Sequence, residues 1–436
     1  MAMLPSDMKY NPNFDANKEA GPRESLTAQP SNGSSFQMNQ PIEITVPMRQ
    51  PEYVWDSKNS YVSFDITNKN ATQANILHFQ AYCGTLGMVN QQIIKTSTGT
   101  EFSNFDGYNV LSPLLMEQVD KDWYNSTGNI LFGMKHSDTA TDASEGDSIS
   151  GVGGTNVVHK ILPLINTGVS NPYFPMGSLA DIVLRFKLDT VANCFVADLG
   201  AVANTEVEIS NIVYHYDIYK LSPSVLASFG PNYVIDTTDW VHQQYASPAT
   251  DVKYSVSIGF AKQKIKRLIM VSRSTDRLGA ESNSGLMARN QAGITKIYAK
   301  LDGKTFQSSS GVEMARTTNM VDAFAELLKN NGGLLEMSAK NNTLDRFSLL
   351  GAGTDPTTYE TCGSFYHEIS FSNSMDTDAS TSGVAINHNN LQVFVEKAQT
   401  EAQTVDFFIE FYNQYTMNRN ERVWQVSDPI QFSQAQ

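Results

Sequence analysis

The feature that most constrains this chain is a strand, turn, strand and helix pattern that occurs twice. Residues 91–111, QQIIKTSTGTEFSNFDGYNVL, combine an apolar strand, a Gly-centred turn, a second short strand and an aromatic-led helical segment. About two hundred residues later, ITKIYAKLDGKTFQSS followed by NMVDAFAELLKN repeats that order. Self-similarity at a fixed separation indicates a duplicated structural unit. We therefore expect two copies of one fold, and 436 residues are enough for two domains.

Alternation of apolar and polar residues indicates strands in both halves. In residues 61–67, Val62, Phe64 and Ile66 share one face of a half-buried strand. The phase of the alternation shifts within residues 207–219, which predicts a β-bulge near Asn211. Further alternating segments are 182–188, 254–260, 365–371, 391–395 and 405–411.

These strands suit a jelly roll, in which eight short strands form a sandwich. The pattern predicts an all-β protein of two tandem eight-stranded jelly rolls with short inserted helices. The clearest expected helix is in residues 319–333, where Val321, Phe324, Leu327 and Leu328 form an apolar stripe.

Composition sets the expected domain limits. Residues 1–38 are rich in Pro, Asn, Ser and Gln and lack an apolar period, which predicts a flexible N-terminal arm. We expect jelly roll 1 at 39–230, jelly roll 2 at 245–422 and a C-terminal tail at 423–436.

Charge and cysteine content exclude several classes of protein. The net charge of -14 argues against sequence-specific nucleic-acid binding, which needs a positive surface. Cys83, Cys194 and Cys362 are odd in number and far apart, so we expect buried thiols and not disulfides. The N-terminus lacks the basic flank and apolar run of a signal peptide, and no stretch reaches the ~18 apolar residues of a membrane span. We expect synthesis in a cytoplasm.

Candidate ligand sites have weak support. GVGGT at 151–155 lacks the G-K-[ST] of a phosphate-binding loop, and a flexible loop is the stronger interpretation. Asp376, Asp378 and Ser380 resemble part of a calcium loop but lack its Gly and Glu. The seven histidines have no zinc spacing, and His215 and His367 fit strand positions inside a sandwich.

Catalytic motifs are also missing from the sequence. It has no GxSxG, and its carboxylates form no spaced acid/base pair. We predict no catalytic, cofactor-binding or metal site, and no enzymatic activity.

One basic cluster occurs in KQKIKR at 262–267. Lys262, Lys264 and Lys266 would share a strand face, with Arg267 beside them. On an acidic chain this cluster could be an interior or subunit-contact patch, or a nuclear-import signal. A solvated strand end is the stronger interpretation of the cluster, and these contact or import roles are the alternatives.

Three segments resemble the double jelly-roll major capsid proteins of adenoviruses, tailless membrane-containing bacteriophages, virophages and Polinton-like viruses. They are CGTLGMVNQQIIKTSTGTEFSNFDGYNVLSPLLMEQ, VEISNIVYHYDIYKLSPSVLASF and VDFFIEFYNQYTM, within a similarity that covers about residues 40–420. The resemblance implies a homotrimer whose six rolls form a pseudo-hexagonal tile of an icosahedral virion shell, with or without an internal membrane.

The resemblance also implies partners and outer loops. Neighbouring capsomers and minor capsid, cement and vertex (penton) proteins would contact the tile, and the two termini could join tiles. The long outer loops would be 120–178, 272–292, 330–364 and 372–388.

A carbohydrate- or receptor-binding double β-sandwich is the alternative function. Exposed aromatic residues beside amides or carboxylates bind sugars, and Trp123 in DKDWYNST fits that pattern. The other tryptophans are Trp55, Trp240 and Trp424.

Overall fold

A computed structural model provides the fold of this chain. It describes residues 20–48, 52–80, 83–116, 123–134, 145–163, 173–176, 180–223, 232–258, 263–275, 289, 293–301, 303–305, 311–314, 317–330, 365–371, 384–386, 391–398, 402–418 and 423–427.

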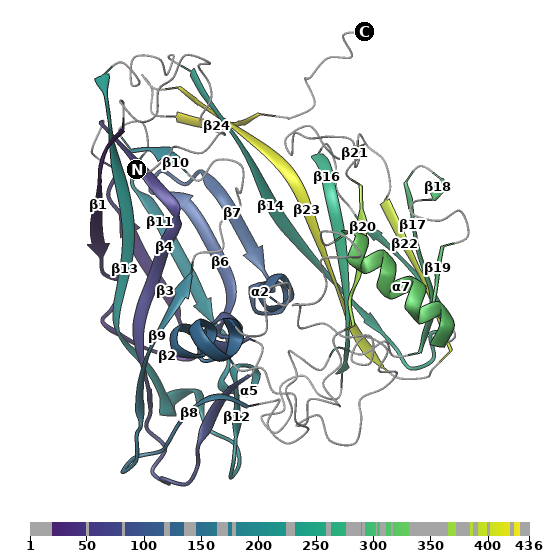
Figure 1. Cartoon of the computed structure of the whole chain (residues 1–436), viewed down its shortest axis with the longest axis horizontal. Helices are drawn as coiled ribbons and strands as arrows, with labels where there is room; N and C mark the ends of the chain where they lie inside the picture. The colour runs from purple at the N-terminus through teal and green to yellow at the C-terminus, as the bar shows by residue number, and fades with distance from the viewer. Residues whose placement is uncertain are drawn as a thin grey trace.

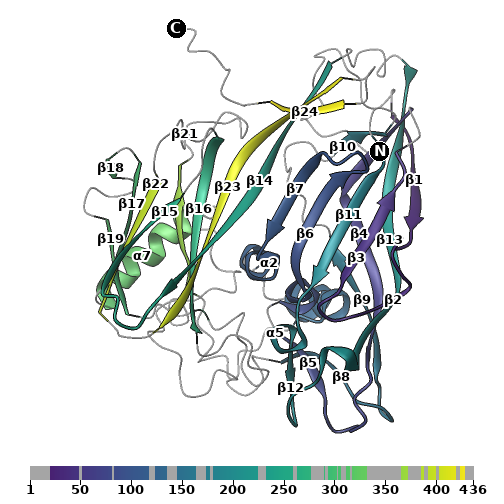
Figure 2. The same cartoon turned by 180° about the vertical axis from the view of Figure 1, so that it is seen from behind.

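The first half of the chain forms a sandwich of two antiparallel sheets (Figures 1 and 2). Its strands are β1 (Ala20–Ala28), β2 (Ser35–Gln37), β3 (Pro41–Val46), β4 (Tyr53–Asn68), β6 (Val89–Thr96), β7 (Glu101–Asp106), β9 (Val157–Pro163), β10 (Tyr173–Pro175), β11 (Ile182–Leu188) and β13 (Val207–Leu221). One sheet has the order β1-β13-β4-β10, with β2 beside β13 and β9 beside β4, and the other has the order β3-β11-β6-β7. A small sheet at one end of this roll joins β12 (Phe195–Ala197), β5 (Leu77–Gln80) and β8 (Glu145–Ile149).

The second half forms another two-sheet antiparallel sandwich. Its strands are β14 (Asn232–Ser247), β15 (Lys253–Ile258), β16 (Gln263–Ser274), β17 (Ile294–Leu301), β18 (Lys304–Thr305), β19 (Val312–Glu313), β20 (His367–Ser370), β21 (Val384–Ile386), β22 (Leu391–Lys397), β23 (Gln403–Asn418) and β24 (Val423–Ser427). One sheet has the order β14-β23-β16-β20, with β21 beside β16 and β24 beside β23. The other has the order β15-β22-β17-β18, with β19 beside β17.

The two rolls have the same strand order, which confirms the predicted duplication. In one sheet of each roll, β3-β11-β6-β7 corresponds to β15-β22-β17-β18; in the other, β13-β4 corresponds to β23-β16. In each roll, two facing sheets with four strands in their main order give the eight strands of a jelly roll. The all-β double jelly-roll prediction is therefore confirmed.

The repeated hairpins form as predicted. Thr96 N–H donates to the Thr100 carbonyl at 2.8 Å, and Gly99 adopts a positive φ of 98° in the β6–β7 turn. Gly303 has φ 77° in the equivalent β17–β18 turn. Such backbone angles favour glycine, because a Cβ atom is crowded there.

A helix follows each hairpin, as expected. α2 (Tyr108–Met116) follows β7, and α7 (Thr317–Asn330) follows the β17–β18 hairpin and β19. In α7, Phe324 and Leu327 are buried as predicted, but Val321 is 50% exposed and Ala323 is buried in its place. The side chain of Leu328 lies outside the described residues.

The predicted bulge in the closing strand of roll 1 is confirmed. The β13–β4 register shifts between Ser210 and Val213, and Asn211 has φ 51°. Its side-chain amide donates to Asp65 at 2.6 Å, so a residue that tolerates the left-handed region also fastens β13 to β4.

Several predicted boundaries were wrong. Within the predicted arm 1–38, residues 20–28 and 35–37 are strands β1 and β2 that pair with β13. Backbone pairing at a sheet edge can order a polar sequence that has no apolar period. Residues 1–19 lie outside the described residues.

The boundaries after residue 230 change for the same reason. Roll 2 begins with β14 at Asn232 and not at residue 245, because β14 pairs along its whole length with β23. The predicted tail 423–436 begins with strand β24, which also pairs with β23.

The expected outer loop 120–178 also contains regular structure. Short helices η3 (Tyr124–Gly128) and α4 (Asn129–Phe132) and strands β8, β9 and β10 lie within it. Most of 272–292, 330–364 and 372–388 lies outside the described residues.

Candidate functional site

The candidate site is the seam between the two rolls, where β7 and the start of α2 meet β14 and β23 (Figures 1 and 2). The ring of Phe105 on β7 lies 6.0 Å from the ring of Phe408 on β23. Gly107 follows with φ 75°, and a Cβ atom there would lie 3.0 Å from His242 Nδ1 and 3.1 Å from the Phe408 ring. The absence of a side chain at Gly107 therefore permits this approach of the rolls.

A buried ionic network lies next to this contact. The Asp406 carboxylate accepts hydrogen bonds from His242 Nε2 at 2.8 Å, Gln244 Nε2 at 3.0 Å and two Arg273 nitrogens at 2.9 and 2.6 Å. Burial alone would raise the pKa of Asp406, but the Arg273 charge and these donors hold it well below its usual range. The network fixes β14, β23 and β16 side by side, with the His242 ring stacked on Phe408 at 4.8 Å.

A second polar contact crosses the seam directly. Ser103 Oγ on β7 donates to Asp239 Oδ1 on β14 at 3.0 Å, and the Trp240 N–H donates to the same oxygen at 2.8 Å. Burial raises the pKa of Asp239 to about 7, against the lowering effect of these two donors. The seam thus contains a carboxyl group that titrates near neutral pH.

The predicted basic cluster lies partly on the same sheet. Lys266 Nζ lies 3.1 Å from Glu410, and Arg267 bonds the same carboxylate through Nε and Glu368 through Nη1 at 3.5 Å. The Arg267 guanidinium also lies 5.1 Å from the centre of the Trp240 ring. The structure therefore places these two basic residues in ion pairs within their own roll.

The other two predicted basic residues are not placed. Lys262 lies outside the described residues, and Lys264 has only its backbone described, in β16. The bulge between Ile265 and Arg267 interrupts the alternation on which the shared face of the three lysines depended.

Burial also shifts the pKa values of two titratable groups on β20. The pKa of His367 falls to about 4, because burial disfavours its charged form. The pKa of Glu368 rises to about 7, because burial outweighs the favourable charge of Arg267. In roll 1, His215 on β13 hydrogen-bonds Ser63 at 2.8 Å and stacks on Tyr61, so it fits the predicted structural role.

The other sequence candidates have structural functions where they are described. In the 151–155 loop, the N–H groups of Gly151, Val152 and Gly154 already donate to backbone carbonyls, and a Cβ on Gly151 would lie 2.2 Å from the Thr72 carbonyl oxygen. Trp123 is half-buried and packs 5.7 Å from Phe132. Asp376, Asp378 and Ser380 lie outside the described residues.

The cysteine prediction holds at two of three positions. Cys83 and Cys194 are buried thiols outside any disulfide, and burial raises the pKa of Cys194 well above its usual range. Cys362 lies outside the described residues. In the part of the chain that the structure describes, no cluster of three or more His, Cys, Asp or Glu side chains is arranged to hold a metal ion.

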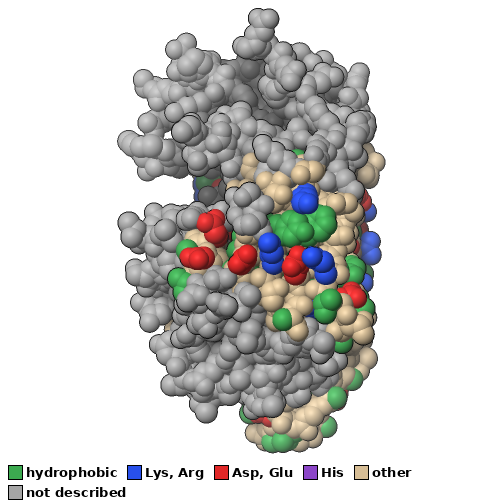
Figure 3. All heavy atoms as spheres, turned by 90° about the vertical axis from the view of Figure 1, so that its right-hand side faces the viewer, with side chains coloured by type: hydrophobic (Ala, Val, Ile, Leu, Met, Phe, Trp, Pro, Cys, Tyr) green, Lys and Arg blue, Asp and Glu red, His purple; other side chains and the backbone are tan. Residues whose placement is uncertain are grey.

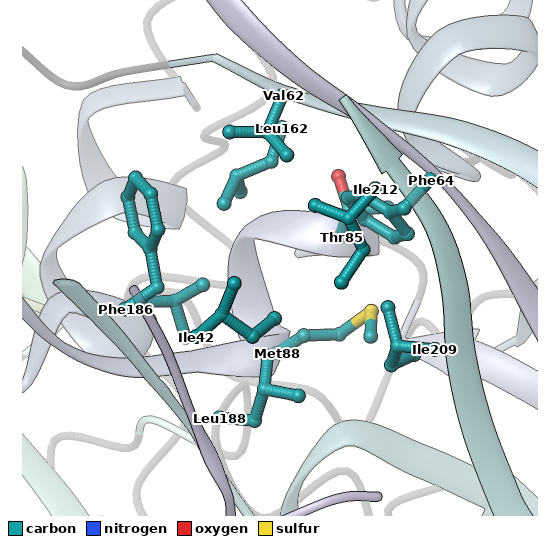
Figure 4. A pocket seen from close by; sticks show the side chains of 11 residues that line it. Ile42, Val62, Phe64, Thr85, Met88, Leu162, Phe186, Leu188, Ile209 and Ile212 are labelled. Atoms are coloured by element: carbon teal, nitrogen blue, oxygen red, sulfur yellow. The ribbon is translucent and has the colours of Figure 1, made fainter. Parts of the chain in front are cut away.

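A cavity of about 20 Å³ lies between the sheets of roll 1 (Figure 4). Its lining is aliphatic and aromatic apart from Thr85, whose hydroxyl donates to the Ile161 carbonyl at 2.7 Å. A polar ligand would find no free partner there, so the cavity is a packing gap of the core. None of the described helices has both the length and the apolarity needed to cross a bilayer.

The seam residues were not predicted from the sequence. A signal exists in residues 405–411, where Asp406 and Glu410 alternate with Phe407, Ile409 and Phe411. The alternation predicts a strand with one buried face. In the structure the opposite face, with Asp406, Phe408 and Glu410, is as buried as the face with Phe407 and Ile409. A second apolar layer, supplied by roll 1, covers part of that face.

Solved structures resemble this chain over nearly its whole length. The Sputnik virophage structure matches with a TM-score of 0.59 and 12% identity over 99% of this chain and 93% of that one. The Faustovirus major capsid protein matches with a TM-score of 0.59 and 8% identity, over 95% and 92% of the two chains. The mavirus major capsid protein matches with a TM-score of 0.51 and 13% identity, over 93% and 90%.

The comparison of sequences gives no relative. No family model and no curated protein matches the chain. The structural likeness establishes the fold, and the chain is a double jelly roll like these proteins.

Proposed function

We propose that this protein is a major capsid protein, three copies of which form a pseudo-hexagonal capsomer that tiles an icosahedral virion shell. The observation that carries the proposal is the seam, which joins two rolls of equal strand order into one body. A single hydrophobic cluster includes Phe105 of roll 1 and Phe408 of roll 2. Because its two rolls are fixed side by side, each copy would contribute two of the six rolls in a hexagonal outline.

The proposed role is structural and not enzymatic. Four groups with shifted pKa values are buried in sheets, where a substrate has no access: Asp239, Glu368, His367 and Asp406. Asp239 accepts a hydrogen bond from Ser103 of the other roll, which supports a function in holding the rolls together. Asp406 and Glu368 pair with basic residues of neighbouring strands in roll 2, which supports a function in holding that sheet together. The similarity to the mavirus and Faustovirus major capsid proteins supports the same function.

Neighbouring capsomers are the proposed principal partners, with minor capsid, cement and vertex proteins as additional ones. The basic stretch 262–267 remains a proposed interior or subunit contact, to which Lys262 and Lys264 would contribute. Lys266 and Arg267 contribute less, because Glu410 and Glu368 compensate their charges.

Analytical ultracentrifugation of the purified chain tests the proposed function. We expect a particle of about three times the 48.1 kDa chain mass over a wide concentration range. A chain that stays monomeric at all concentrations and salt conditions would contradict the proposal.

The alternative function, a carbohydrate-binding double sandwich, has less support from the structure. Trp55 and Trp240 are buried, and Trp123 packs on Phe132.

A further inference from the structure

The outward face of the sheet β15-β22-β17 in roll 2 has an ordered arrangement of side chains. Three cross-strand rows run across it, and alternation places all members on the same side. The rows are Lys253–Glu396–Lys296, Ser255–Phe394–Tyr298 and Ser257–Gln392–Lys300. We call these nine residues the lysine–aromatic face.

The nine residues point away from the core of roll 2. The residues between them on the same strands, such as Val256, Val393 and Ala299, are buried, whereas those of the face are exposed or half-exposed. Both cartoon views place β22 and β17 on the side of roll 2 away from roll 1, and β15 pairs with β22 (Figures 1 and 2). Figure 3 shows this side, where hydrophobic side chains are bordered by basic and acidic ones.

An aromatic pair forms the middle of the face. The rings of Tyr298 and Phe394 stack with centres 4.8 Å apart and planes 4° apart. Lys300 Nζ lies 5.5 Å from the Tyr298 ring centre and 5.2 Å from that of Phe394, and Lys296 Nζ lies 5.9 Å from Tyr298. Each ring therefore covers one face of the other, and the ammonium groups of two lysines lie close to the pair.

The charge of the face is opposite to that of the chain. It contains three lysines and one glutamate, whereas the whole chain has a net charge of -14. Glu396 pairs with Lys253 at 2.7 Å, and Glu313 lies opposite Lys296 at the edge of the sheet. Lys300 has a neutral cross-strand partner, Gln392, so its ammonium group can pair with an acidic surface outside this roll.

The arrangement of an aromatic pair within a polar and charged border fits the anatomy of a protein interface. Tyrosine and phenylalanine are enriched in interface cores, and charged and polar groups surround them. A flat sheet face suits a broad protein surface better than a small ligand, which binds in a concave site. The acidic surplus of the chain supplies a complementary partner.

We propose that the lysine–aromatic face binds an acidic surface on a second copy of this chain. This inference rests on the proposed capsid function and adds the surface through which copies join. The contact is heterologous, because a basic face meets a different, acidic surface on the next copy. Such contacts close into a ring when the rotation between copies permits, and three copies would give a trimer.

Two sets of variants test the proposal. Tyr298→Ser with Phe394→Ser removes the aromatic pair, and Lys296→Glu with Lys300→Glu reverses the charge. We expect each set to raise the Kd of self-association at least about 30-fold, the effect of losing a strong interface residue. Circular dichroism and thermal unfolding establish that each variant is folded.

Matched controls change similar groups elsewhere. Leu199→Ser alters a leucine of roll 1 that is 63% exposed, and Lys187→Glu reverses an exposed lysine on β11 of the same roll. Both should associate within about threefold of the wild type. Folded variants of the lysine–aromatic face that associate as tightly as the wild type would overturn the proposal and leave the capsid function standing.

A second measurement needs no variant. Acetylation of Lys296 and Lys300 in the wild-type protein, followed by mass spectrometry, should slow at least about fivefold on assembly. Unchanged reactivity in the assembled protein would contradict the proposal. Heparin serves as a polyanion probe: if the charge-reversal variant loses heparin binding but assembles normally, the face binds an external polyanion and the proposal is wrong.

Discussion

Gly107 shows how a single residue controls the contact between the rolls. Its φ is 75°, and the space that a Cβ would occupy is bounded by His242 and Phe408 of the other roll. Gly303 has a nearly equal φ of 77° but open space around it. A comparison of alanine substitutions at the two glycines therefore separates the cost of backbone strain from the cost of packing at the seam.

We expect Gly107→Ala to lower the free energy of unfolding by about 2–4 kcal/mol, since it combines a left-handed backbone with overpacking. Gly303→Ala should cost about 1–2 kcal/mol, from the backbone alone. Urea unfolding of both variants measures the difference. Equal losses would show that Gly107 has no special function at the seam.

Asp239 makes the seam sensitive to pH. Burial raises its pKa from 3.8 to about 7 in the folded protein. Between these values the unfolded chain is ionised and the folded one is not, so this group's contribution to stability is full below pH 4, falls as pH rises toward 7 and is constant above. The total loss is on the order of a few kcal/mol.

Asp239→Asn removes this titration and keeps an oxygen that can accept from Ser103 Oγ. We expect the variant to become more stable relative to the wild type as pH rises from 4.5 to 7.5. Thermal unfolding at a series of pH values measures that difference. A difference that does not change with pH would show that Asp239 is ionised throughout in the folded state.

The elements of the seam depend on one buried ion pair. Asp406 on β23 and Arg273 on β16 are nearly inaccessible to water, and β14 contributes His242 and Gln244 to the same carboxylate. Such a pair adds little net stability, but loss of one partner leaves a buried charge without compensation.

Asp406→Asn should therefore lower the free energy of unfolding by about 3–5 kcal/mol. The double variant Asp406→Leu with Arg273→Met removes both charges and should cost less than Asp406→Asn alone. Urea unfolding of Asp406→Leu, Arg273→Met and the double variant gives the coupling energy. Additive costs would show that the two residues act independently.

The strands could be predicted from sequence because a sandwich core imposes alternation, as in β22 with Leu391, Val393 and Val395. Edge strands β1 and β24 could not, since backbone pairing holds them and leaves little trace in side chains. The seam was missed because alternation distinguishes two faces of a strand but not what covers them. Asp406 and Glu410 occupy a face that water would cover in a single sandwich.

The whole molecule is two copies of one sandwich that share a seam. Equal strand order was predictable from the repeated hairpin and helix, because both copies retain the Gly-centred turn. The relative placement of the rolls depends on contacts between residues that are far apart in the chain, such as Ser103 with Asp239. No local pattern encodes those contacts.

A rigid pair of rolls explains why such a chain suits a shell. The seam residues join the two rolls, and in the proposed assembly the opposite side of roll 2 presents the lysine–aromatic face to another copy. The protein would then act by assembly, with each copy as a two-roll unit of a larger threefold particle.

Electron microscopy of the purified, negatively stained protein tests this account most directly. The account predicts particles with threefold symmetry and a hexagonal outline, in which six rolls can be counted. Isolated two-lobed particles, or rings with a different number of copies, would contradict it.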